Sequence, residues 1–289
     1  MQTQAMIRNS HLKGADLSGI DFSGMDLRNK DFSGSKMVGA ILNNVNCEGA
    51  DFFGADLSGS RMIGGNFKSA RFCKANLANV QAAYADMTGI QAIDVCLHQA
   101  YLTGAILYHA DLSYADMTKV IAQEANITCA ILSNADMSGS ILIKSDFTDS
   151  YMESVCLERA DAQATIFFCT KLMCASAVGA NFSFATLRQS EADDANFSYA
   201  KMNQANLSLV SFRYARFCHA DLEETAMYRS DFTRANLEFA NVAGANMARA
   251  VLKDAKLHHI TLTWEDWESA IKQGADIHMV DVTEGEEDV

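Results

Sequence analysis

The sequence of 289 residues contains no proline. At the usual frequency of about 5%, a chain of this length would carry roughly 14 prolines. Proline lacks a backbone N–H and therefore interrupts any ladder of backbone hydrogen bonds. Its absence is what an uninterrupted ladder along most of the chain requires.

Long apolar runs and a basic leader segment are absent as well. No window approaches 18 uncharged apolar residues, so we expect no membrane-spanning segment. The first 20 residues do not combine a basic segment with an apolar one, so we expect no secretory signal. The eight cysteines contain no C-x-x-C pair, and we expect them to be reduced in a cytoplasmic protein.

What the sequence does contain is a repeat of five residues. In steps of five from Leu12 to Leu262, all 51 positions are apolar, mostly Leu, Phe and Met. The residue two places earlier is small, most often Ala, and the residue between the two is most often Asp or Asn. A helix repeats every 3.6 residues and a strand every two, so neither explains this pattern.

A chain that turns a corner every five residues does explain the repeat. Four such turns close a coil of 20 residues, in which the large residue fills the centre and the small one points inward beside it. Asp and Asn favour turns because their side chains bond nearby backbone groups. Successive coils would then bond backbone to backbone, as parallel strands do at a spacing of about 4.8 Å.

The motif Ala-(Asp/Asn)-(Leu/Phe/Met)-x-x resembles that of the pentapeptide-repeat family. The resemblance covers residues 5–262 and implies an all-β fold, a right-handed quadrilateral parallel β-helix. Because the register never slips between Leu12 and Leu262, we expect one solenoid of about 13 coils.

A different pattern follows the repeats. Thr263 and Asp266 have the spacing of a helix capping box, and Gly274 can end the helix. An apolar helix face would be formed by Trp264, Trp267, Ala270 and Ile271. We expect a short capping α-helix and a strand over residues 263–282, followed by a disordered acidic tail over residues 283–289. The apolar face is a candidate lid on the last coil and a candidate dimer contact, and both roles can hold together.

No catalytic or phosphate-binding motif occurs, and the solenoid centre is filled by its own side chains. We therefore expect no enzyme, no cofactor and no metal site. One column of residues spaced by 20 is chemically suggestive: His109, Cys129, Asp149 and Cys169. A straight ladder spreads four such ligands over about 14 Å, whereas zinc needs all of them within about 2–2.3 Å. The pattern favours a chance arrangement, and any role for this column is left open.

A second column holds four rings, Tyr199, His219, Phe239 and His259. They would stack near the C-terminal end, either as outward side chains packed along the ladder or as an exposed interface. We take them as the candidate interface. Basic residues are frequent over residues 213–256, but acidic residues interleave with them, which predicts a mixed solvated face.

Three functions agree with these features. The first is a non-catalytic scaffold whose faces bind a protein partner that the sequence does not identify. The second is what the resemblance implies: some family members are DNA mimics that bind DNA gyrase or topoisomerase IV, protect against quinolones, and form homodimers through their C-terminal ends. This chain lacks the loop insertions that interrupt the coils of several such members. The third is a secreted bacterial effector.

The formal net charge of −13 first suggests DNA mimicry, but it is unevenly distributed. Residues 263–289 carry nine acidic residues and one lysine, so the repeats themselves are only weakly acidic. The charge therefore supports DNA mimicry less than the rod shape does. We expect a cytoplasmic bacterial protein that binds no membrane and no nucleic acid directly, and that can form a homodimer through its C-terminal end.

Overall fold

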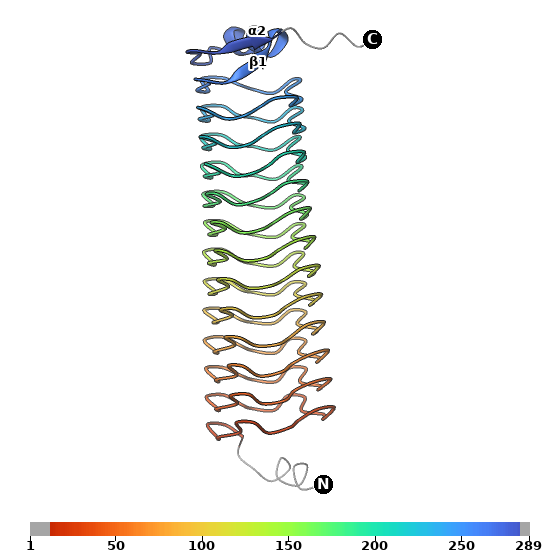
Figure 1. Cartoon of the computed structure of the whole chain (residues 1–289). Coiled ribbons are helices and arrows are strands. Elements are labelled where there is room, and N and C mark those ends of the chain that lie inside the picture. The colour runs from red at the N-terminus through yellow and green to blue at the C-terminus, as the bar shows by residue number, and fades with distance from the viewer. Residues whose placement is uncertain (1–11, 284–289) are drawn as a thin grey trace. The chain divides into compact units, whose positions relative to one another are not determined.

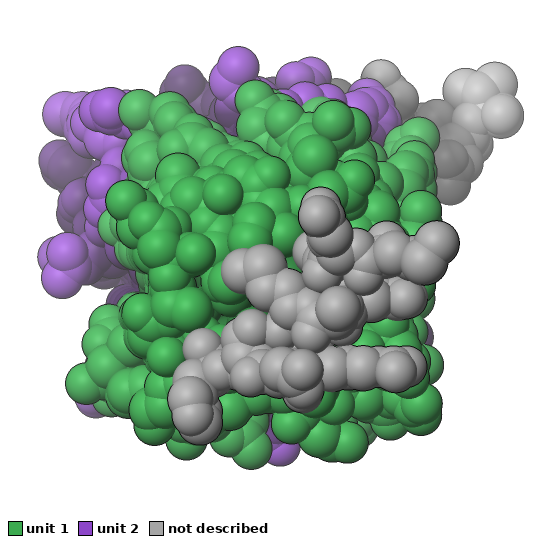
Figure 2. Space-filling view, turned by 90° about the horizontal axis from the view of Figure 1, so that it is seen from below, with its two compact units in different colours: residues 1–146 green, residues 147–289 purple. Residues whose placement is uncertain are grey.

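The computed structural model of the chain describes residues 12–283. The chain divides between Asp146 and Phe147 into two compact units, which Figure 2 colours separately. Both are stacks of the same kind of coil (Figure 1).

In both units the backbone turns every five residues. In the first turn the carbonyl of Leu12 accepts the N–H of Ala15 at 3.2 Å. Residues 20 apart pair in parallel, for example Asp16 with Lys36 in the first unit and Tyr151 with Lys171 in the second. The coil therefore has four sides of five residues each, as the sequence predicts.

Each coil is hydrogen-bonded to its neighbours through its backbone. The N–H of Lys36 donates to the carbonyl of Ala15 at 2.9 Å, and the carbonyl of Lys36 accepts the N–H of Leu17 at 2.7 Å. This pattern recurs on every side of the coils within each unit. Most backbone N–H groups on the sides are thus engaged, which explains why proline is excluded there.

The large residue of each repeat fills the coil centre. All 51 positions from Leu12 to Leu262 are at most 7% exposed. Phenylalanines spaced by 20 stack on one another, and the ring centroids of Phe32, Phe52 and Phe72 follow at 5.0 and 4.8 Å. Burial of this apolar column is the main source of stability of each unit.

The Asp or Asn of each repeat stabilises the turn that follows it. The carboxylate of Asp21 accepts the backbone N–H of Ser23 at 2.8 Å, and Asp51 accepts that of Phe53 at 2.9 Å. The predicted preference for turn-forming side chains is confirmed, because these oxygens bond the N–H groups that the ladder leaves over.

The third residue of each turn adopts a positive φ, the feature of a type II turn. Of the 50 such corners between Gly14 and His259, 36 carry a residue other than glycine. This conformation brings Cβ too close to the following carbonyl oxygen, at a cost of about 1–2 kcal/mol per residue. At most corners the backbone of a residue other than glycine is therefore held in a strained conformation.

We expect Ala164→Gly to stabilise the protein by about 0.5–1 kcal/mol. Ala164 has a φ of 54° and a small side chain, so relief of strain outweighs the greater flexibility of glycine in the unfolded chain. Unfolding in guanidinium chloride measures the effect. The matched control is Ala226→Gly, at a position without positive φ, which should destabilise by a similar amount. Equal losses in both variants would contradict this account of the corners.

The second unit ends in three elements, β1 (Thr261–Thr263), α2 (Trp264–Lys272) and β2 (Asp281–Thr283). β1 and β2 pair in parallel with Leu262 opposite Val282, and Lys256 pairs with Asp276. The spacing of 20 therefore continues across the helix, so α2 replaces part of one coil (Figure 1).

The predicted helix is confirmed, with one difference at its cap. Thr263 accepts the N–H of Asp266, as expected of an N-cap. The carboxylate of Asp266 accepts the Thr263 hydroxyl at 2.7 Å, in place of the backbone N–H that a capping box engages. Gly274, with a φ of 75°, follows the last turn and lets the chain leave the helix.

The apolar face of α2 buries fewer of its side chains than the sequence suggests. Ala270 is buried, but Trp264 is 58% exposed, Ile271 is 48% exposed and Trp267 is half-buried. The helix is anchored instead by Gln273, whose side-chain amide accepts the N–H of Leu252 at 2.9 Å and donates to the carbonyl of Ala250 at 3.2 Å. Trp264 and Ile271 thus lie largely in solvent, and Ala270 is the buried residue of the helix.

The ends of the chain limit two other predictions. β2 extends to Thr283, one residue into the predicted tail. The remainder of that tail, and the start of the repeat before Leu12, lie outside the described residues. Within residues 12–283 no helix is long and apolar enough to cross a membrane.

Candidate functional site

The second unit carries four exposed rings at one corner of successive coils. Tyr199, His219, Phe239 and His259 stack with centroid distances of 4.9, 4.8 and 4.5 Å and interplanar angles of 8°, 5° and 5°. We call these four residues the ring stack. Tyr199 is 60% exposed and Phe239 49% exposed, so the rings cover one another's faces but leave their edges in solvent.

The backbone explains why the rings align. Each of the four has a positive φ between 56° and 61° and occupies the third position of its turn. Their backbone N–H groups donate to backbone carbonyls of the next coil: that of Tyr199 to Cys218, that of His219 to Glu238, and that of Phe239 to His258. Successive corners are thereby held one coil apart, at about the spacing of stacked aromatic rings.

A polar cluster beside the ring stack holds its C-terminal end. Nδ1 of His258 lies 3.0 Å from Oε1 of Glu238, and Nε2 lies 3.1 Å from Oδ2 of Asp276. The second contact is not aligned as a hydrogen bond. A hydrogen bond from the Asn236 amide, with contributions from the neighbouring His258 and Lys256 side chains, lowers the pKa of Glu238. Glu238 and His258 directly precede Phe239 and His259, so the cluster fixes the backbone from which these rings project.

The column of possible metal ligands is divided between the two units. His109 and Cys129 lie in the first unit, and Asp149 and Cys169 in the second. The ring of His109 packs on that of Tyr108 with centroids 4.1 Å apart. Among residues 12–283 no three or more His, Cys, Asp or Glu side chains are grouped so that they could hold a metal ion.

A cavity of about 190 Å³ opens beside α2, which the sequence did not predict. It is lined mainly by Val242, Gly244, Met247 and Leu262, where the helix replaces a coil side. Asp266 is the one titratable group among its described lining residues. Burial raises the pKa of Asp266, and the negative charge of Glu265 adds to this.

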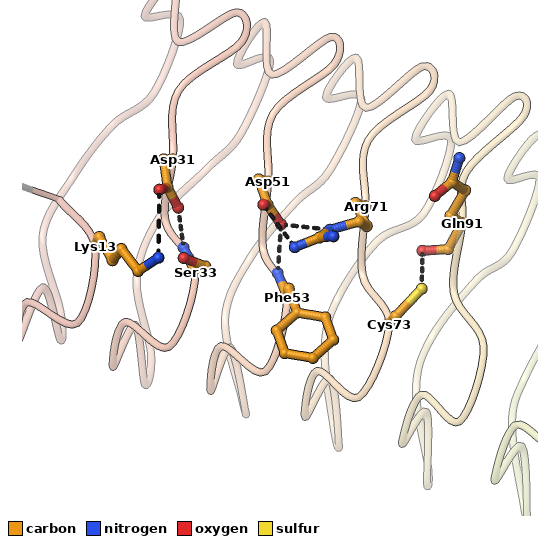
Figure 3. Close-up of polar contacts among 8 residues, drawn as sticks. All are labelled: Lys13, Asp31, Ser33, Asp51, Phe53, Arg71, Cys73 and Gln91. Atoms are coloured by element: carbon orange, nitrogen blue, oxygen red, sulfur yellow. Dashed lines mark hydrogen bonds and ion pairs between the residues drawn. The ribbon is translucent and has the colours of Figure 1, made fainter.

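Some charged side chains on the coils form ion pairs with side chains of neighbouring coils. On one side of the first unit, Nζ of Lys13 lies 4.0 Å from Asp31 (Figure 3). In the same view Arg71 holds Asp51 with two hydrogen bonds of 2.9 and 2.8 Å, while its guanidinium lies 4.8 Å from the ring centroid of Phe53. Paired in this way, Arg71 presents little unbalanced charge to a partner.

Comparison with protein families accounts for the repeat. The model described as pentapeptide repeats matches eight times, over residues 7–44, 31–68, 85–121, 96–134, 130–167, 178–213, 193–227 and 230–264. The chain belongs to the pentapeptide-repeat family. The resemblance drawn from the five-residue motif is thereby confirmed. A comparison with curated proteins finds no match.

Comparison with solved structures finds a pentapeptide repeat protein of similar fold. HetL, a pentapeptide repeat protein involved in heterocyst differentiation regulation from the cyanobacterium Nostoc sp. strain PCC 7120, matches with a TM-score of 0.58 at 22% identity, covering 88% of this chain and 94% of HetL. A family member from the Arabidopsis thaliana thylakoid lumen matches at 27% identity with a TM-score of 0.25, over 39% of this chain and 73% of its own. QnrB1, a plasmid-mediated fluoroquinolone resistance protein, matches at 16% identity with a TM-score of 0.30, over 74% of this chain and 89% of its own.

Proposed function

We propose that the chain is a non-catalytic scaffold, a right-handed quadrilateral β-helix in the cytoplasm, that binds a protein partner through the ring stack. The observation that carries the proposal is four parallel rings exposed at one corner of four successive coils. Aromatic side chains lose little conformational entropy on binding and are enriched among the residues that dominate interface energies.

The ring stack suits binding because it is already ordered. Its rings are held parallel by one another and by the backbone ladder, so a partner orders little on contact. Their exposed edges combine apolar carbon with the Tyr199 hydroxyl and the imidazole nitrogens of His219 and His259, which supply both contact area and hydrogen bonds.

We expect the double variant His219→Ala/Phe239→Ala to bind the partner at least tenfold more weakly than the wild type. The experiment is quantitative affinity capture from lysate of the source organism, with the captured protein identified and its affinity then measured. The matched control is Tyr84→Ala/Tyr114→Ala, which removes two exposed rings of the first unit that stack on no other ring among residues 12–283. A partner held equally by all three proteins would overturn the role of the ring stack.

The exposed end of α2 is proposed as a self-association contact. Trp264 and Trp267 stack with centroids 4.9 Å apart, and Ile271 adds an exposed apolar side chain. We expect Trp267→Asp to halve the mass of a homodimer measured by light scattering, because a carboxylate placed in an apolar contact is costly to desolvate. A well-folded variant that keeps the dimer mass would remove this contact.

A type II topoisomerase, DNA gyrase or topoisomerase IV, is the alternative partner. It rests on the resemblance to family members that mimic DNA, and the net charge of −13 adds little to it because most of that charge lies in residues 263–289. A gyrase supercoiling assay with and without ciprofloxacin tests it directly. Inhibition of supercoiling, or protection from the drug, would favour this partner, and the absence of both would remove it.

A further inference from the structure

One side of the second unit differs from all the others in its charge. It is built from residues 166–170, 186–190, 206–210, 226–230 and 246–250, which parallel pairing places side by side. We call these five segments the arginine face, because they carry Arg188, Arg229 and Arg249 and no Asp, Glu or Lys, whereas Asp149 lies on the same side one coil before them. Over the same coils the other three sides all contain acidic residues, for example Asp193, Asp221 and Glu238. A net positive face is thus set into a chain of net charge −13.

The three arginines pack on aromatic rings instead of carboxylates. The guanidinium groups of Arg229 and Arg249 lie 5.2 and 5.9 Å from the ring centroid of Tyr228, and that of Arg188 lies 6.0 Å from Phe168. Nη1 of Arg249 also donates to the Tyr228 hydroxyl at 3.2 Å. These contacts hold the guanidinium groups in place on the surface.

None of the three makes an ion pair with a described residue. All three are exposed, and each keeps donors that no described carboxylate accepts. By contrast, Arg71, Arg213 and Arg234 each meet an aspartate of a neighbouring coil, as Figure 3 shows for Arg71. The arginine face therefore offers positive charge that the protein itself leaves unbalanced.

We propose that the arginine face is a docking surface for a protein partner that presents carboxylates. Arg229 and Arg249 lie on adjacent coils and converge on one ring, so together they can hold a carboxylate by charge-assisted hydrogen bonds. Ile166 and Leu209, both exposed on the same face, supply the apolar contact. This proposal rests on the function of the chain as a scaffold but uses a surface separate from the ring stack.

Two observations favour an acidic protein over a nucleic acid. Proteins that hold single strands do so by stacking bases on free aromatic faces, whereas the faces of Tyr228 and Phe168 are taken up by guanidinium groups. A protein that binds duplex DNA commonly contacts about 6–10 phosphates, whereas this face has three cations on a strongly acidic chain. A short acidic segment of a protein matches the number of cations without bringing a long polyanion against the remaining acidic residues.

The test measures binding of a fluorescently labelled random copolymer of glutamate and tyrosine to the full chain. We expect R188Q/R229Q/R249Q to bind it about tenfold or more weakly than the wild type. The control R71Q/R213Q/R234Q makes the same change in net charge at arginines already paired with aspartates, and should bind within about threefold of the wild type. Circular dichroism confirms that both variants are folded.

Three results would overturn the proposal: no binding of the copolymer to the wild type, equal loss in both triple variants, or tighter binding of an oligothymidylate through the same three arginines. The last of these would assign the face to nucleic acid. The His219→Ala/Phe239→Ala variant separates the two proposed surfaces, since it should bind the copolymer as the wild type does. If partner capture fails while copolymer binding depends on the arginine face, only the proposed role of the ring stack is excluded, and the proposal for the arginine face stands.

Discussion

Phe212→Ala is expected to lower the free energy of unfolding by about 3–5 kcal/mol. The Phe212 side chain is fully buried in the second unit, at the centre of a group of rings. Its centroid lies 5.8 Å from that of Phe197, 5.0 Å from Phe217 and 5.2 Å from Phe232. Truncation removes contacts with all three rings at once, and the surrounding coils cannot close the gap because the backbone ladder fixes their spacing.

Phe239→Ala is the matched control for this loss. Phe239 also stacks on two rings but is 49% exposed, so its removal opens no cavity and should cost below about 1 kcal/mol. Denaturant unfolding of both variants measures the difference. Equal destabilisation would show that the ring stack stabilises the second unit as much as the filled centre does, and would contradict its role as a free binding surface.

The features that depend on the register could be predicted from the sequence. Once the period of five and the coil of 20 are recognised, Phe212 must face the centre, and Tyr199, His219, Phe239 and His259 must share a corner. No long-range contact has to be guessed, because each coil pairs only with its neighbours. Their near-parallel arrangement follows from the same spacing, which matches the distance between stacked rings.

The features that break the register could not be predicted in this way. The pattern of Trp264, Trp267 and Ile271 indicated an apolar helix face but not the direction in which it points. The side-chain amide of Gln273 holds the helix, because it accepts the N–H of Leu252 and donates to the carbonyl of Ala250 as a backbone peptide group of the next coil would. Nothing in the periodicity distinguishes this glutamine from other polar residues. The cavity beside α2 follows from the same substitution of a helix for coil sides.

The arginine face was missed for a different reason. Read along the chain, Arg229 and Arg249 are interleaved with acidic residues such as Asp231 and Glu238, which suggests a mixed surface. Sorted by side of the coil, those acids lie on other sides, and Asp231 is already paired with Arg213. The signal was present in the sequence as five segments spaced by 20 without an acidic residue.

The position of a proline, and not its presence alone, should decide whether a coil tolerates it. We expect Gln81→Pro to lower the free energy of unfolding by about 2–4 kcal/mol. The N–H of Gln81 donates to the carbonyl of Ser60 at 2.9 Å, and Gln81 pairs with residues of the coils on both sides. Proline would remove this bond, leave the Ser60 carbonyl without its donor, and place a ring between two coils.

Ala83→Pro, two residues further in the same repeat, should change the unfolding free energy by less than about 0.5 kcal/mol. Ala83 is the second residue of a turn in which Ala85 donates to Ala82, and no described residue accepts its own N–H. Proline is favoured at this position of a type II turn. Chemical denaturation of the two variants therefore tests whether the ladder excludes proline. If Ala83→Pro proves as damaging as Gln81→Pro, the hydrogen-bond explanation fails, and the absence of proline must reflect the geometry of the whole repeat.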